Sequence, residues 1–157
     1  MPNVSIDLQI ACSDGEDALP DLDTLEKWSR TALMVADYNA DAELTVRLVD
    51  EDEIHNLNRD YRQVDRPTNI LSFPFECPPE VSIPLIGDLV ICTSILKKEA
   101  AEQQKSFWEH FAHLIVHGTL HLIGYDHIEP EDAQIMEPLE VRALAVLGYP
   151  DPYVLKD

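Results

Sequence analysis

The chain of 157 residues has the length of one domain, long enough to bury a hydrophobic core without disulfide bonds or a structural metal. Its composition of 45% hydrophobic and 26% charged residues excludes a disordered chain, and the sequence has neither a membrane-length apolar run nor a signal-peptide pattern, so we expect no membrane association and no secretion. The formal net charge of −19 repels polyanions, so any nucleic-acid-binding function needs its few cations gathered at one place.

Three cysteines are spread along the chain, at Cys12, Cys77 and Cys92, and no two of them form a Cys-x-x-Cys pair. An odd number of distant cysteines is typical of reduced thiols rather than of a disulfide framework. We therefore expect a cytoplasmic protein.

Hydrophobic patterns predict the elements of the first third of the chain. Apolar residues at every second position predict strands over residues 4–10 and 44–48, and apolar residues at helical spacing predict a helix over residues 22–39. Asp50 then precedes a short amphipathic segment, with Glu53 three positions later. We expect a helix there whose first turn is held by a capping box.

Prolines divide the middle of the chain. Pro67 favours an extended entry into a strand over residues 69–73, and four prolines within residues 74–84 predict a loop or an edge excursion. The apolar run at residues 89–92 predicts a buried strand. A helix is expected to follow over about residues 93–105, capped by the side chain of its first or second residue.

Two further helices are expected near the end of the chain, over about residues 107–122 and 130–148. Four strands in one block and five helices, several of them after the last strand, indicate an α+β fold. We expect a mixed sheet of about four strands packed with about five helices. No repeat or linker-like tract divides the sequence, so residues 1–157 are expected to form a single domain.

Five of the six histidines lie between His110 and His127. On a helix, His117 and His121 are one turn apart and share a face, so two imidazoles can approach one point. Gly124 is the residue type that ends a helix in a left-handed turn, which would bring His127 back as a third ligand. Three neutral imidazoles with an open fourth position predict a catalytic site for one zinc ion. The alternative is a set of packing or helix-face histidines.

Three neighbours of these histidines are expected to play other roles. His110 and His113 precede them on the same predicted helix and are expected to support the ligands or to pack. Asp126 is able to orient an imidazole, but it is equally suited to a simple turn. None of the three is expected to bind the metal.

The histidine spacing also matches the metzincin pattern His-Glu-x-x-His-x-x-Gly-x-x-His at every position but one. The glutamate of that pattern is replaced by Gly118. In peptidases this glutamate is the general base that takes a proton from metal-bound water, which glycine cannot do. The site can still bind a metal that acidifies water, so Gly118 argues against peptide hydrolysis but not against metal chemistry.

Four separated segments together resemble the YbeY family of bacterial endoribonucleases, and the resemblance covers essentially the whole chain. These segments are residues 57–62 (LNRDYR), 65–74 (DRPTNILSFP), 87–91 (GDLVI) and 117–127 (HGTLHLIGYDH). The resemblance implies a cytoplasmic, metal-dependent, single-strand-specific endoribonuclease with a zincin-like α+β fold. Such enzymes act in ribosomal RNA maturation, notably at the 3′ end of the small-subunit RNA, and in ribosome quality control.

The resemblance also implies residue roles and partners. Zinc would be held by His117, His121 and His127, and the family's functional arginine falls on Arg62. The expected partners are single-stranded ribosomal RNA and the ribosome or its proteins, whose basic patches would suit so acidic a chain. Neither DNA nor a membrane is expected as a partner.

Three arginines, Arg59, Arg62 and Arg66, lie within eight residues and give the predicted site a means of binding phosphate. The guanidinium of Arg62 is able to bind a phosphate with two hydrogen bonds, whereas a surface salt bridge is its alternative role. Arg59 and Arg66 are expected to be solvated or to attract RNA by charge. Ser72 and Thr68 are candidate hydroxyl donors in the cleft that would hold the metal and Arg62. Their alternative roles are in helix capping or strand pairing.

Our mechanistic hypothesis combines a zinc ion that activates water or polarises a phosphate oxygen with Arg62 holding the phosphate for in-line attack. The sequence leaves open the general base and whether water or the RNA 2′-hydroxyl attacks. Two other functions compete with this hypothesis. One is a zincin-type metallopeptidase, and the other is a non-enzymatic, ribosome-associated module with a structural metal.

Overall fold

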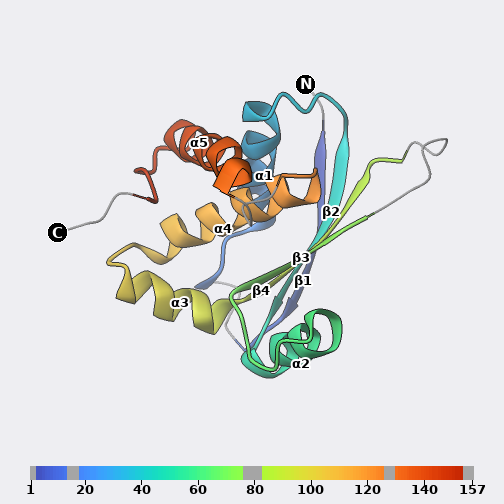
Figure 1. Ribbon diagram of the computed structural model, residues 1–157, viewed down its shortest axis with the longest axis vertical. Helices are drawn as coiled ribbons and strands as arrows, with labels where there is room; N and C mark the ends of the chain where they lie inside the picture. Colours follow the sequence, from blue (N-terminus) through green and yellow to red (C-terminus); the bar gives the residue numbers. More distant parts are fainter. Residues whose placement is uncertain (1–2, 14–17, 76–82, 126–129, 154–157) are drawn as a thin grey trace.

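One mixed four-stranded sheet forms the centre of the molecule (Figure 1). The computed structural model describes residues 3–13, 18–75, 83–125 and 130–153. The strands are β1 (Val4–Ala11), β2 (Ala42–Val49), β3 (Ile70–Pro74) and β4 (Leu85–Cys92), in the spatial order β1-β2-β4-β3. The pairs β1–β2 and β2–β4 are parallel, and β3 lies antiparallel to β4 at one edge.

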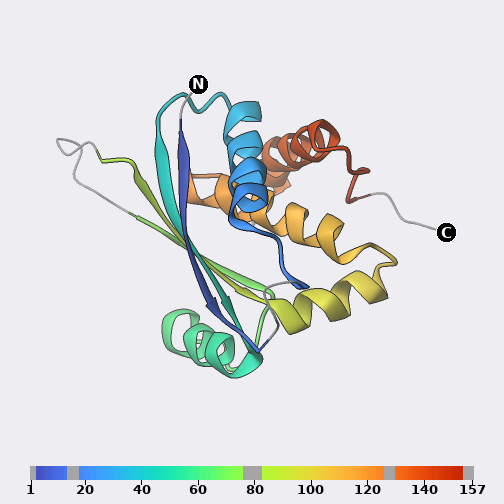
Figure 2. The same ribbon diagram turned by 180° about the vertical axis from the view of Figure 1, so that it is seen from behind.

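Four of the five helices in the described part of the chain cover one face of this sheet, and the remaining helix lies on the other face (Figures 1 and 2). The first group contains α1 (Leu22–Val35), α3 (Thr93–Glu102), α4 (Phe107–Leu122) and α5 (Pro130–Val146), and the helix on the other face is α2 (Glu51–Arg62). The predicted α+β fold is confirmed. The helix over residues 107–122 has the predicted bounds.

The period-two pattern of the strands sorts the core into two layers. Even-numbered residues of β1 and β2, such as Ile6 and Val46, point toward α1, α4 and α5 and form the larger hydrophobic cluster. On the opposite face, Leu71 and Val90 pack with Ile54 of α2 in a smaller cluster. Helix α4 lies at the centre of the larger cluster, with Phe111 and Ile115 among its fully buried residues.

The predicted capping box at the start of α2 is wrong. Asp50 does occupy the N-cap position, but its side chain makes no capping hydrogen bond. Its Oδ1 atom instead accepts hydrogen bonds from the backbone N–H and the hydroxyl of Ser13, at 3.1 and 3.2 Å. Glu53 is also engaged elsewhere, because both of its oxygens bind the guanidinium of Arg47 on β2. Partners distant in sequence therefore outcompete the local pattern.

Two helix boundaries also differ from the predictions. Cys92 is the N-cap of α3, and its side chain makes no capping hydrogen bond. The hydroxyl of Ser94 donates a hydrogen bond to Glu51 across 3.3 Å. Helix α1 ends at Val35 rather than near residue 39. The backbone turns left-handed at Asp37, with a φ of 57°, and this turn stops the helix without a glycine.

Among the described residues, no helix combines the length and the apolar character that a membrane crossing requires. Cys12 and Cys92 are free thiols, as predicted. Cys77 lies outside the described residues.

Gly87 allows the close pairing of β3 and β4. Its φ of 147° lies in the region that favours glycine, and a Cβ atom there would come within 2.4 Å of the Phe73 carbonyl oxygen. The same atom would lie 2.7 Å from Leu122 Cδ2 at the end of α4. Gly87 thus permits the strand pairing that holds β3 beside α4.

We predict that Gly87→Ala lowers the free energy of unfolding by about 2–5 kcal/mol, the sum of an unfavourable φ and of overpacking. Gly148→Ala is the matched control, because Gly148 also has a positive φ of 89°, yet a Cβ atom added there would meet no atom of the described residues within 4 Å. Its expected cost is about 1–2 kcal/mol. Urea unfolding of both variants measures the difference, and equal costs would contradict the steric argument.

Candidate functional site

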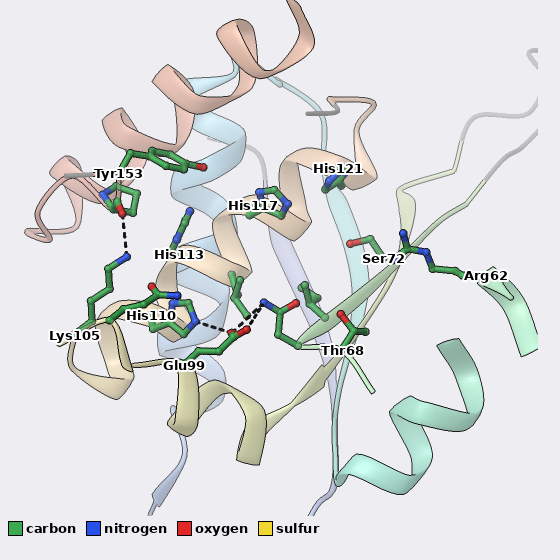
Figure 3. Close-up of a pocket in the computed structure, with 15 residues that line it drawn as sticks. Arg62, Thr68, Ser72, Glu99, Lys105, His110, His113, His117, His121 and Tyr153 are labelled. Atoms are coloured by element: carbon green, nitrogen blue, oxygen red, sulfur yellow. Dashed lines mark hydrogen bonds and ion pairs between the residues drawn. The ribbon is translucent and has the colours of Figure 1, made fainter. Parts of the chain in front are cut away.

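A cavity of about 700 Å³ lies between α4, β3 and the end of α2 (Figure 3). Four histidines of α4 line one wall, and residues of the segment from Arg62 to Ser72 line another. The lining residues are Arg62, Thr68, Asn69, Ile70, Ser72, Glu99, Gln103, Lys105, His110, His113, Leu114, His117, His121, Pro152 and Tyr153. The cavity therefore joins segments from four separate parts of the sequence.

His117 and His121 lie one helical turn apart, as the spacing predicts. Their ring centroids are 4.7 Å apart with the ring planes at 75°, and both side chains line the cavity. Two imidazoles this close are able to approach a single ion from adjacent directions.

Helix α4 ends immediately after these histidines in the predicted left-handed turn. Gly124 has a φ of 109°, and its N–H donates a hydrogen bond to the carbonyl oxygen of His121 over 3.0 Å. The N–H of Tyr125 donates to the carbonyl of Leu120 over 3.1 Å, which completes a Schellman motif. The chain therefore leaves the helix axis directly after His121.

A buried carboxylate on α5 connects two of the histidines. Glu140 is fully buried, and its Oε1 atom lies 2.8 Å from His113 Nε2 and 3.0 Å from His117 Nδ1. Its Oε2 atom accepts a hydrogen bond of 2.9 Å from the hydroxyl of Tyr153. Burial alone would raise the pKa of Glu140, but the hydrogen bonds and charges of His113 and His117 outweigh it and lower this pKa to about 2.

The pKa values of His113 and Tyr153 are shifted as well. Burial lowers the pKa of His113, although Glu140 acts in the opposite direction, and a lowered pKa favours the neutral imidazole. Burial and the nearby Glu140 carboxylate raise the pKa of the Tyr153 hydroxyl, which keeps it a hydrogen-bond donor at neutral pH. The network therefore centres on one buried carboxylate, whose two oxygens face His113, His117 and Tyr153.

A second carboxylate–histidine pair lies at the far end of the cavity (Figure 3). Glu99 Oε1 lies 3.0 Å from Nε2 of the buried His110, and it accepts a hydrogen bond of 3.1 Å from the side-chain amide of Asn69. The hydrogen bond with His110 is the largest cause of a lowered pKa for Glu99. This pair attaches α3 to α4 and to the start of β3.

Arg62 is the last residue of α2, and its side chain lines the cavity near Ser72 and His121 (Figure 3). The helix stops there because Gln63 adopts a left-handed conformation, with a φ of 57°. The buried Asn58 donates a side-chain hydrogen bond of 2.8 Å to the carbonyl of Arg66 and so holds the chain that follows. The end of α2 is thereby fixed against the cavity.

The other predicted phosphate-binding residues separate into two groups. Thr68 and Ser72 line the cavity, as expected for hydroxyl donors. Arg59 and Arg66 are exposed and are not among the lining residues, and Arg59 pairs with Asp60 at 3.1 Å. Within the described part of the chain, Arg62 has no such carboxylate partner.

The donor set present fits a metal ion in part. His117 and His121 supply two adjacent imidazoles, the ligand type that zinc prefers. Within the described ranges, no group of three His, Cys, Asp or Glu side chains is arranged to hold a metal ion. His127, the third predicted ligand, and Asp126 lie outside the described residues.

Comparison with known proteins identifies the family. The sequence model of the family described as Endoribonuclease YbeY matches residues 9–148. The chain belongs to the YbeY endoribonuclease family. It is also similar to the solution structure of TM1509 from Thermotoga maritima, with a TM-score of 0.55 and 28% sequence identity, over 90% of this chain and 91% of that one.

Membership of the YbeY family supports a nuclease role in ribosomal RNA processing, with RNA as the substrate of hydrolytic cleavage. This agrees with the resemblance predicted from the four sequence segments. The family match ends at residue 148, whereas the cavity is completed by Pro152 and Tyr153 beyond it.

Sequence reasoning missed Glu99, Glu140 and Tyr153, although all three contact histidines of the YbeY cavity or their partners. Glu140 had a detectable signal. It stands in the buried stripe of α5 that includes Met136 and Leu144, where a fully buried charge requires partners. Glu99 and Tyr153 carried no comparable local pattern.

Gly118 faces the sheet rather than the cavity. A Cβ atom at this position would lie 2.8 Å from Leu89 Cδ2 and 2.9 Å from Ile70 Cδ1. The absence of a side chain at Gly118 therefore lets Leu89 and Ile70 pack directly against α4. The position where metzincins carry their general base is, in this YbeY protein, a packing position.

We predict that Gly118→Glu destabilises the protein and confers no peptide hydrolysis, because the added side chain enters the apolar contact with Leu89. Gly118→Ala tests the packing with a single carbon. Overpacking of about 1–3 kcal/mol is expected to outweigh a gain of up to about 1 kcal/mol in helix propensity. Thermal unfolding and a peptidase assay provide the measurements, and a stably folded Gly118→Glu variant that cleaves peptides would refute this assignment.

Proposed function

We propose that this YbeY protein is a metal-dependent, single-strand-specific endoribonuclease with one zinc ion held by His117, His121 and His127. We further propose that it acts in the cytoplasm on the 3′ end of the small-subunit ribosomal RNA and in ribosome quality control. The observation that supports this most is the juxtaposition of His117 and His121 with Arg62 around one cavity. Metal ligands and a phosphate-binding cation are the two parts that phosphodiester cleavage requires.

A zinc ion in this site would supply Lewis-acid chemistry and a bound water of lowered pKa. The chain's own residues position the RNA. Arg62 binds the scissile phosphate through its guanidinium and offsets the charge that develops on it, while the hydroxyls of Ser72 and Thr68 donate hydrogen bonds to phosphate or ribose oxygens. Arg62 is suited to this role because no carboxylate in the described ranges competes for it.

The size of the cavity supports the proposed preference for single strands. A volume of about 700 Å³ is that of a small-ligand pocket and admits an unpaired nucleotide rather than a duplex. Unpaired nucleotides can be extended so that a phosphate enters the cavity. Base pairing would hold the backbone outside it.

The net charge of −19 governs how the enzyme reaches its substrate. RNA is repelled by the surface at long range, so the enzyme depends on local cations, with Arg62 and Lys105 lining the cavity. Ribosomal proteins carry basic surfaces that complement an acidic one. We therefore propose that contact with the ribosome or its proteins delivers the enzyme to RNA.

The metallopeptidase alternative is disfavoured by Gly118, which is a packing residue in the α4–sheet contact. The non-enzymatic alternative assigns the metal a structural role. It differs in one observable, because chelation of a structural metal would unfold the protein. The described core is instead built from apolar contacts of the sheet with four helices.

We predict that His117→Ala abolishes zinc binding and reduces RNA cleavage by at least about 100-fold, and that Arg62→Ala reduces cleavage by about 100- to 1,000-fold while zinc binding is retained. His55→Ala and Arg59→Ala are the matched controls, because these side chains pair with Asp65 and Asp60 and do not line the cavity. Elemental analysis and cleavage of an unstructured RNA provide the measurements.

Three results would decide against the proposed function. Cleavage retained by both His117→Ala and Arg62→Ala would remove the site from the reaction. Peptide turnover lost in His121→Ala would favour the peptidase. Unfolding on chelation, together with unchanged RNA phenotypes of Arg62→Ala, would favour the non-enzymatic module.

The attacking nucleophile is tested separately with RNA carrying a single 2′-deoxy sugar at the scissile position. If the internal 2′-hydroxyl attacks, cleavage at that position is expected to stop. If water attacks, cleavage continues.

A further inference from the structure

Glu140 is buried in a helix face that is otherwise apolar. Its exposed fraction is 0%, and Met136, Ala143 and Leu144 are its buried neighbours on α5. Burying a carboxylate among such residues is costly unless it is paired and hydrogen-bonded. The contacts of Glu140 with His113, His117 and Tyr153 supply that pairing. The burial of this carboxylate is therefore tolerated because of these three partners and not because of its apolar neighbours on α5.

These contacts determine which ring nitrogens carry protons. An ionised carboxylate only accepts hydrogen bonds, so a neutral ring that contacts Glu140 Oε1 must donate from the nitrogen that faces it. His117 faces it with Nδ1, at 3.0 Å. The proton of neutral His117 therefore lies on Nδ1, and Nε2 carries the lone pair that binds a metal.

His113 faces the same oxygen with Nε2, at 2.8 Å, and so takes the opposite tautomer. Its Nδ1 atom is buried without a hydrogen-bond partner in the described part of the chain. A buried nitrogen that lacks a partner is less unfavourable as an acceptor than as an N–H donor, which agrees with this tautomer. The two rings thus share one oxygen through different nitrogens.

Tyr153 fixes the other carboxylate oxygen. Its hydroxyl donates a hydrogen bond of 2.9 Å to Glu140 Oε2, and its ring packs edge-on against His113, with centroids 5.6 Å apart. The segment that carries it is attached to the start of α4 by a hydrogen bond of 3.0 Å from Lys105 Nζ to the carbonyl of Pro152. Glu140 is thereby held from both sides.

We propose that Glu140 is a positioning residue that fixes His117 in the Nδ1–H tautomer and presents its Nε2 atom as the metal-binding nitrogen, with Tyr153 holding the carboxylate in place. This inference deepens the proposed function and rests on its assignment of His117 as a ligand. Glu140 itself touches neither metal nor RNA and acts only through the imidazole. Carboxylates behind metal-bound histidines typically increase metal affinity by about 10- to 100-fold.

The first test is the tautomer of His117 in the full-length chain after removal of metal with a chelator, read from the ¹⁵N chemical shifts of the ring nitrogens at neutral pH. We expect the Nδ1–H form of His117 and the Nε2–H form of His113. The opposite tautomer of His117 in the wild-type protein would overturn the proposal without any variant.

The second test compares zinc affinity, measured by competition with a chromogenic chelator. Glu140→Leu keeps the approximate volume but removes both acceptors, so we expect a dissociation constant about 10- to 100-fold higher and loss of the fixed tautomer. Glu140→Gln keeps one acceptor oxygen and is expected to retain much of the zinc affinity and of the fixed His117 tautomer. Tyr153→Phe is expected to raise the dissociation constant only a few-fold, because the carboxylate still reaches both rings.

Glu131→Gln is the matched control, an exposed glutamate in the first turn of the same helix, and is expected to change neither measurement. Unchanged zinc affinity in folded Glu140→Leu would overturn the positioning role and leave the proposed function intact. If Glu140→Leu does not fold, the wild-type tautomer and Glu140→Gln still decide the question. The predicted tautomer in a protein that binds no zinc would instead count against the proposed metal site.

Discussion

The site depends on the close contact of α4 with the sheet at Gly118. The absent side chain lets Leu89 and Ile70 reach the helix backbone, at distances that even a methyl group would obstruct. This contact places His117 and His121 within reach of the residues that β3 and the end of α2 supply. The same glycine removes the general base of a peptidase. One packing contact therefore keeps α4 close to β3 and β4 and leaves the helix without the glutamate of the metzincin pattern.

Local patterns predicted the parts of the site that lie within one helix. The four-residue spacing of His117 and His121 and the left-handed turn at Gly124 follow from helical geometry alone, and both are present. The resemblance of four segments to a known family identified that family, which the match over residues 9–148 confirms. The positions of Thr68 and Ser72 beside the histidines agree with the prediction of a shared cleft.

Local patterns failed where a side chain has a partner that is distant in sequence. Asp50 and Glu53 have capping-box spacing, but Ser13 and Arg47 bind them instead. Glu140 lies 23 positions from His117, and no short pattern reveals that pairing. These contacts arise only when the sheet has brought its connecting segments together, so they require the fold rather than the motif.

The distribution of carboxylates explains how a chain with a net charge of −19 can form a site for a polyanion. Among the described residues, the two carboxylates that contact the histidines of the cavity are already bound, since Glu140 is fully buried and Glu99 is bound by His110 and Asn69. Both carboxylates face imidazoles, Glu99 that of His110 and Glu140 those of His113 and His117. Among the described residues, Arg62 has no carboxylate partner, whereas Arg59 pairs with Asp60. Acidity at the surface is thus compatible with a phosphate site, provided that each carboxylate near the cavity has a donor of its own.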